Sequence, residues 1–350
     1  MHVKPRRALR PGNTGRFCAC NGWQPLRRHA TARAHFDHAA ATGPCQRAQV
    51  ATPGRSHRSQ QRGSARSAKP PQTMHFQRSR FLPWISAACL GAALLAGAAW
   101  AGTAEGVRAY DRGQFALAAK ELQPAAQAGD PEAQFHLGLM HDFGKGVQLD
   151  HAKAAALYRK AAEQGHADAQ YHLAVSYDDG EGVPQDFKQA VYWYTQAANQ
   201  GLAKAQYNLG VSYDKGEGVA KDHQMAAQWY RKAADQGDSD AQYNLGVAYD
   251  EGEGVPQDHQ QAVAWYRKAA AQNHVRAQFN LAVSYDDGEG VAQDKKQAVH
   301  WYTKAAEQGD ADAQQNLSVM YARGEGVARD AAKSRYWARK ARESRARGED

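Results

Sequence analysis

Tryptophan recurs at a fixed interval along the second half of this chain. Five tryptophans stand 36 positions apart, and the sequence around each is nearly the same: Trp193, Trp229, Trp265, Trp301 and Trp337. Self-similarity at a period of about 20 to 50 residues is typical of units that each bury their apolar face against the next unit. We therefore predict a stack of repeats rather than a globule, and we expect function on its surface.

One repeat consists of two segments with helical spacing of apolar residues. Residues 167–178 contain no helix breaker before Gly180, a residue type that ends many helices. Asp186 is placed to cap a second segment, residues 187–199, which Gly201 stops. The same frame starts again at residues 131, 167, 203, 239, 275 and 311. The sequence thus predicts an all-α fold with six 36-residue helical hairpins over residues 131–346, followed by a short tail, 347–350.

A small residue recurs in the first segment of the repeats, at Gly138, Ala174, Gly210, Gly246 and Ala282. Such a position lets a neighbouring helix approach closely, and we expect the large Trp and Tyr side chains of the second segment to project toward it. The five tryptophans are therefore assigned to the structural core, where they lock one repeat onto the next.

The repeats share the strings Ala-x-Ala-Gln-Tyr-x-Leu-Gly-x-x-Tyr, then Gly-x-Gly-Val-x-x-Asp, then Ala-x-x-Trp-Tyr-x-Lys-Ala-Ala. This pattern resembles the Sel-one-like repeat (SLR) family, which is related to the tetratricopeptide repeat. The resemblance implies a right-handed superhelical α/α solenoid whose first helices line a concave surface that holds peptide or protein segments. Residues 102–130 look like a shorter tetratricopeptide-type hairpin that caps the amino-terminal end. In the sixth repeat Ser334, Ala338 and Arg342 replace Ala, Tyr and Ala, and this drift to less apolar residues fits a cap at the other end.

Charge divides the chain into two unlike parts. Residues 1–101 hold 16 Lys and Arg and one acid, a charge of +15, whereas residues 102–350 hold 28 Lys and Arg against 35 Asp and Glu, a charge of −7. The total of +8 therefore misrepresents the repeats, which are mildly acidic. Because phosphate backbones are held by basic surfaces, nucleic acid is excluded as a partner.

The basic part ends in a segment with the features of a secretory signal. Residues 74–80 are basic, residues 81–98 are apolar, and Ala99-Trp100-Ala101 offers small residues to a signal peptidase. We expect a signal peptide at 74–101, cleavage after Ala101, and a periplasmic or secreted product without stable membrane insertion. Residues 1–73 are either a disordered basic segment or the result of a start assigned too early, with Met74 the true start. All four cysteines precede the cleavage point, so disulfides and thiolate chemistry are excluded from the mature chain.

Three rows of first-segment residues are candidates for partner binding. We expect them to hold an unknown protein or peptide segment with apolar and basic residues, since rigid rings and an acidic edge suit such a segment. The alternatives are that the rings pack between adjacent hairpins, that the aspartates are helix-end and turn residues, or that the rings stack on sugars. The rows are aromatic (Phe135, Tyr171, Tyr207, Tyr243 and Phe279), aliphatic (Val175, Val211, Val247 and Val283) and acidic (Asp142, Asp178, Asp214, Asp250 and Asp286).

Metal sites, cofactors and catalytic residues are not expected. The acidic turns lack the alternating oxygens and the bidentate acid of a calcium loop. Histidines one repeat apart are separated by about 10 Å at their backbones, which is far for shared coordination. Residues copied in every repeat are usually structural, whereas an active site is normally built once. We therefore expect an adaptor rather than an enzyme. Two alternatives stay open, namely a β-lactam-binding or hydrolysing enzyme, as the resemblance to cysteine-rich SLR proteins implies, and a structural protein that binds cell-envelope glycan.

Overall fold

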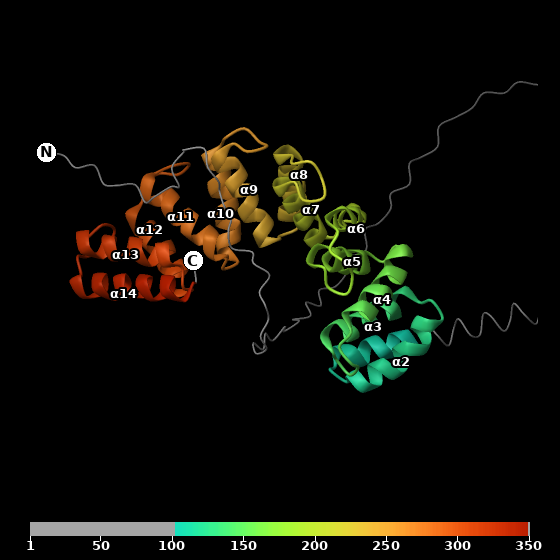
Figure 1. Ribbon diagram of the computed structural model, residues 1–350. Coiled ribbons are helices and arrows are strands. Elements are labelled where there is room, and N and C mark those ends of the chain that lie inside the picture. Colours follow the sequence, from blue (N-terminus) through green and yellow to red (C-terminus); the bar gives the residue numbers. More distant parts are fainter. Residues whose placement is uncertain (1–101, 349–350) are drawn as a thin grey trace, which may run out of the picture. The chain divides into compact units, whose positions relative to one another are not determined.

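The computed structural model describes residues 102–348, which are entirely helical with connecting turns (Figure 1). The segments expected to be a basic extension, 1–73, and a signal peptide, 74–101, lie outside the described residues. A helix over residues 102–111 comes first. The others are α2 (Phe115–Gln127), α3 (Pro131–Phe143), α4 (His151–Glu163), α5 (Ala167–Asp179), α6 (Phe187–Asn199), α7 (Ala203–Lys215), α8 (His223–Asp235), α9 (Ser239–Glu251), α10 (His259–Ala271), α11 (Val275–Asp287), α12 (Lys295–Glu307), α13 (Ala311–Arg323) and α14 (Ala331–Arg347).

These helices pair into consecutive hairpins along the chain (Figure 1). The odd-numbered helices from α3 to α13 are the first helices of six repeats, and the even-numbered helices from α4 to α14 are the second helices. Each first helix packs against the second helix of its own repeat and, on its other side, against the second helix before it. The predicted all-α solenoid of helical hairpins is confirmed. Within the described residues, no helix has the length and apolar character needed to cross a bilayer.

Side-chain caps and left-handed glycines fix where the helices begin and end. The Asp186 carboxylate accepts hydrogen bonds from the backbone N–H groups of Lys188 and Gln189, at 3.0 and 3.1 Å, and so starts α6. Gly180, with φ of 74°, ends α5 in a conformation that costs other residues about 1–2 kcal/mol. Because Asp caps every second helix and Gly ends every first helix, the same hairpin forms six times.

The two large aromatic residues of each second helix point to different neighbours. Tyr266 is only 1% exposed, and a Cβ added to Gly246 would lie 2.6 Å from its ring. The tyrosine alone therefore faces the small position, where the sequence suggested both aromatic side chains. Trp265 turns instead to the preceding repeat, in a cluster with Tyr230 and Leu245. Both side chains are large and apolar, so composition alone cannot separate these two roles.

The other tryptophans repeat this arrangement between their own repeat and the one before it. Trp193 packs on the cluster of Tyr158, Trp229 on that of Tyr194, Trp301 on that of Tyr266 and Trp337 on that of Tyr302. The indoles of Trp229 and Trp265 are buried, with 8% and 4% of their surface exposed, and those of Trp193, Trp301 and Trp337 are half-buried. Each repeat thus inserts one indole into the core of its predecessor.

A close backbone approach also joins consecutive repeats. Gly254, in the turn after α9, has φ of +71°, and a Cβ placed on it would lie 2.0 Å from the carbonyl oxygen of His223. His223 is the first residue of α8, in the preceding repeat. The corresponding glycines of the other repeats make the same approach to the start of the previous second helix. The turn of one repeat therefore packs directly against the backbone of the repeat before it.

Candidate functional site

The buried tyrosine of the second helix is the centre around which the candidate rows assemble. The Tyr194 hydroxyl donates to Asp178 Oδ2 at 3.2 Å and accepts from Asn208 Nδ2 at 3.1 Å. Asn208 lies on α7, the first helix of the next repeat. Burial, together with the negative charge of Asp178, raises the pKa of Tyr194 well above its usual value. The neutral hydroxyl of Tyr194 therefore donates to an aspartate of its own repeat and accepts from an asparagine of the next one, which joins the two repeats.

The acidic row is largely engaged in contacts within each repeat. The Tyr158 hydroxyl donates to Asp142 at 3.1 Å, as Tyr194 does to Asp178. Four members of the row also pair with the first side chain of the following helix. These pairs are His151 with Asp142 at 2.9 Å, His223 with Asp214 at 2.8 Å, His259 with Asp250 at 2.7 Å and Lys295 with Asp286 at 2.6 Å. The row thus joins the end of the first helix to the start of the second, and its carboxylates stay partly open to solvent.

The second helix that follows Asp178 begins with Phe187, so no His or Lys stands at that position to pair with this aspartate. Burial raises the pKa of the Asp178 carboxyl. The hydroxyl of Tyr194 partly compensates, because a hydrogen bond to the ionised form favours that form. Asp178 is consequently the member of the row that has no paired cation at the start of the following helix.

The aromatic row lies against the same tyrosines. Ring centroids are 6.0 Å apart for Phe135 and Tyr158, for Tyr171 and Tyr194 and for Tyr207 and Tyr230, 6.1 Å for Tyr243 and Tyr266, and 5.8 Å for Phe279 and Tyr302. Phe135 is buried and the other four are half-buried. Burial is also the main reason why the pKa of Tyr207 rises to about 12, with the charges of Asp240 and Asp238 adding to it. One side of each ring therefore packs within the repeat.

The aliphatic row borders the face of the first helices that other helices leave uncovered. Val175, Val211, Val247 and Val283 are half-buried and pack on the edge of the core clusters. On α7 this face carries Lys204 and Lys215, both exposed, with Tyr207, Asn208 and Val211 half-buried between them. The structure therefore brings the three predicted rows together on one helix face, with exposed side chains at both ends of each helix.

A row of buried glutamines, not predicted from the sequence, also links the repeats. Gln278 has no exposed surface. Its Nε2 donates to the Ala270 carbonyl of the preceding repeat at 3.2 Å, and its Oε1 accepts from Gln308 Nε2 at 2.8 Å. The same two bonds recur at Gln134, Gln170, Gln206 and Gln242. The recurrence of Gln at one position in all six repeats was the available signal, but polar residues are usually assigned to the surface.

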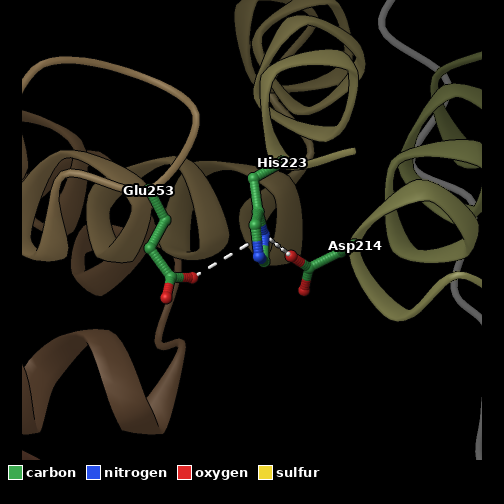
Figure 2. Close-up of side chains that lie close together, drawn as sticks. All are labelled: Asp214, His223 and Glu253. Carbon is green, nitrogen blue, oxygen red and sulfur yellow. Dashed lines mark hydrogen bonds and ion pairs between the residues drawn. The ribbon is translucent and has the colours of Figure 1, made fainter. Parts of the chain in front are cut away.

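Metal-ligating side chains converge at one point of the described region. Asp214, His223 and Glu253 place one ligand atom each within 4.8 Å of one another. The side chains of all three face the same small region (Figure 2). The first two belong to the third repeat and Glu253 to the turn of the fourth. Nitrogen and carboxylate oxygen together form a donor set that suits transition metals.

Taken with the stacked hairpins, these inter-repeat tyrosine, tryptophan and glutamine contacts define a helical repeat scaffold. The family model for the Sel1 repeat matches six consecutive stretches, residues 131–166, 167–202, 203–238, 239–274, 275–310 and 311–344. The chain belongs to the Sel1 repeat family, and the resemblance seen in the sequence is confirmed.

Two solved structures illustrate the likeness. A Sel1 repeat protein from Oxalobacter formigenes is 35% identical, with a TM-score of 0.62, over 69% of this chain and 96% of that one. A protective antigen of uropathogenic Escherichia coli strains that displays an SLR fold is 41% identical, also with a TM-score of 0.62. That match covers 64% of this chain and 48% of the antigen, so it spans about half of that protein. No curated protein matches the chain.

Proposed function

We propose that this protein is an exported, non-enzymatic adaptor that binds an extended protein segment across the face of its first helices. The observation that carries the proposal is the recurrence of one surface. An aromatic ring, a valine and an aspartate stand at the same places of four consecutive first helices, α5 to α11, and all three are half-buried. A surface repeated along a stack suits a ligand that is itself extended and regular.

The chemistry of this face favours a segment with apolar and basic residues. Half-buried rings such as Tyr207 and Tyr243 are already held against a second tyrosine, so little conformational entropy is lost when a ligand covers them. The carboxylates of Asp178, Asp214 and Asp250 lie on the same face, and the sequence from residue 102 onward carries a charge of −7. A basic segment would therefore be attracted, and its binding would weaken with salt.

Export is proposed from the sequence of residues 74–101, which has a basic start, an apolar run and small residues before a cleavage point. The absence of enzymatic activity is proposed because the polar residues of the face are copied from repeat to repeat, as structural residues are.

The test is peptide binding by the full-length chain. Fluorescent twelve-residue peptides with alternating apolar and basic residues, apolar and acidic residues, or neutral residues would be titrated by anisotropy. We expect the basic series to bind most tightly, and the joint change Tyr207→Ala and Tyr243→Ala to weaken it by at least about tenfold. Tyr192→Ala is the matched control, because that aromatic ring is 52% exposed on a second helix. If the double variant and the control lost the same amount of peptide affinity while both kept native circular dichroism, the first helices would not form the binding surface.

A further inference from the structure

We propose that Asp214, His223 and Glu253 form a zinc-binding site that joins the third repeat to the fourth. Figure 2 shows the three side chains pointing toward one another from separate segments. Asp214 is the penultimate residue of α7, His223 the first residue of α8, and Glu253 lies in the turn that follows α9. No other three His, Cys, Asp or Glu side chains within residues 102–348 bring ligand atoms this close together.

The distances fit a tetrahedral ion. His223 Nδ1 lies 2.8 Å from Asp214 Oδ1 and 3.7 Å from Glu253 Oε2. Zinc–ligand bonds of about 2.0–2.2 Å at tetrahedral angles separate neighbouring ligand atoms by about 3.3–3.6 Å. All three ligand atoms lie within 4.8 Å of one another, so movements of up to about 1 Å by the rotatable Asp and Glu side chains would seat an ion between them.

The backbone that carries the ligands is held at the joint between the repeats. Gly254, next to Glu253, is seated on the His223 carbonyl oxygen. Asp214 is held beside His223 by their hydrogen bond. The side chains of Asp214, His223 and Glu253 are 43%, 32% and 52% exposed, so an ion can enter and water can complete its coordination. The site is thus open and three-liganded, and its assembly depends on the stacking of two repeats.

The donor set selects the class of metal. Calcium and magnesium prefer oxygen ligands alone, whereas zinc binds imidazole nitrogen and carboxylate oxygen together. Zinc would take the place of the proton on His223 Nδ1, and Nε2 would carry the ring proton instead. No metal was expected from the sequence, since histidines of consecutive repeats lie too far apart to share an ion. This site uses one histidine and draws its third ligand from the neighbouring repeat.

A simple ion pair is the competing explanation, and the chain itself supplies the controls. Lys295 stands where His223 does and pairs with Asp286 at 2.6 Å, so a cation at this position holds the two helices together without any metal. His259 pairs with Asp250 at 2.7 Å in the same way as His223 with Asp214. His223→Lys should therefore keep the helix contact and lose the metal ligand, while His259→Phe removes an equivalent histidine outside the cluster.

The experiment measures zinc binding by the full-length protein in competition with a chromophoric chelator, at neutral pH and with the four cysteines alkylated. We expect His223→Lys and His223→Phe each to remove one equivalent of bound zinc or to weaken its affinity at least about tenfold. Glu253→Gln should weaken binding in the same direction. His259→Phe should leave that equivalent unchanged, and calcium should not displace it.

Thermal unfolding without zinc separates the two explanations further. His223→Lys should unfold at the wild-type temperature in chelator, and added zinc should raise the midpoint of the wild type but not of this variant. The proposal is overturned if wild-type protein binds no zinc at micromolar concentration, if His223→Lys binds as the wild type does, or if His259→Phe loses as much zinc as His223→Phe.

Discussion

The indole of Trp265 in the fourth repeat lies in the same buried cluster as Tyr230 of the third. Lys268 Nζ covers its ring at 3.5 Å, and only 4% of the residue is exposed. The core of each hairpin is consequently completed by a side chain from the next hairpin. This arrangement explains why a single repeat cannot bury its apolar face alone and why stability should depend on the contacts between repeats.

Replacement of Trp265 by alanine should lower the free energy of unfolding by about 3–5 kcal/mol, because it leaves a cavity between two repeats. Urea denaturation followed by circular dichroism measures the change. Tyr192→Ala, which truncates an exposed ring, should change stability by less than about 0.5 kcal/mol. A loss below about 1 kcal/mol for Trp265→Ala would mean that the indole does not couple the repeats.

Two glycines with positive φ should respond very differently to alanine. Gly237→Ala, at φ of +98° with no atom within 4 Å of the new Cβ, should cost about 1 kcal/mol from backbone strain alone. Asn273 stands at the equivalent place with φ of 65°, so the fold already accepts a side chain there. Gly254→Ala should cost at least about 2 kcal/mol more, since its Cβ would lie 2.0 Å from the His223 carbonyl oxygen. Equal losses in urea denaturation would show that the turn is not seated on the preceding helix.

Gln278→Ala should destabilise the protein by about 1–3 kcal/mol, because it removes both hydrogen bonds of a fully buried side chain and leaves the Gln308 amide with only its long 3.5 Å bond to the Lys304 carbonyl. Gln228→Ala, on the exposed face of α8, is the control and should be nearly neutral. Chemical denaturation of both variants under identical conditions makes the comparison. If the two changes were equally mild, the glutamine row would have no part in spacing the repeats.

Tyr207 should make stability fall in alkaline solution. Its pKa is raised from 10.0 to about 12, mainly by burial, so the folded state prefers the neutral phenol. This contribution is complete below pH 10 and is lost as the pH rises toward 12, by at most about 2–3 kcal/mol. Tyr207→Phe should therefore show a shallower decline of the unfolding midpoint between pH 10 and 12 than the wild type. Tyr192→Phe, which removes an exposed hydroxyl, should follow the wild type, and parallel curves for all three proteins would contradict the assignment.

The hairpins could be predicted because their determinants are local. Asp186 and Gly180 act through hydrogen bonds and dihedral angles within a few residues, and the period of 36 repeats them. The directions of Trp193 and Tyr194 could not be predicted in the same way. Adjacent residues on a helix project about 100° apart, and both side chains are large and apolar, so only the packing of neighbouring repeats decides which one faces its own hairpin.

The candidate site could be predicted from the sequence only in part, because some of its contacts join residues from different segments. The rows of Tyr207, Val211 and Asp214 follow from helical spacing, and the structure places them on one face. The partners of these residues come from elsewhere. His223 reaches Asp214 through the conformation of a turn, and Glu253 reaches His223 through the stacking of the next repeat. Such convergence depends on tertiary geometry that no local pattern encodes.

The most direct test of the proposed binding face is photo-crosslinking of the apolar and basic peptide described above. A photoreactive phenylalanine analogue would replace Lys204, on the open face of the first helix α7, or Gln228, on the exposed face of the second helix α8. We predict crosslinks from position 204 that an excess of unlabelled peptide abolishes, and only background from position 228. Equal labelling from both positions, or labelling from 228 alone, would contradict binding along the first helices.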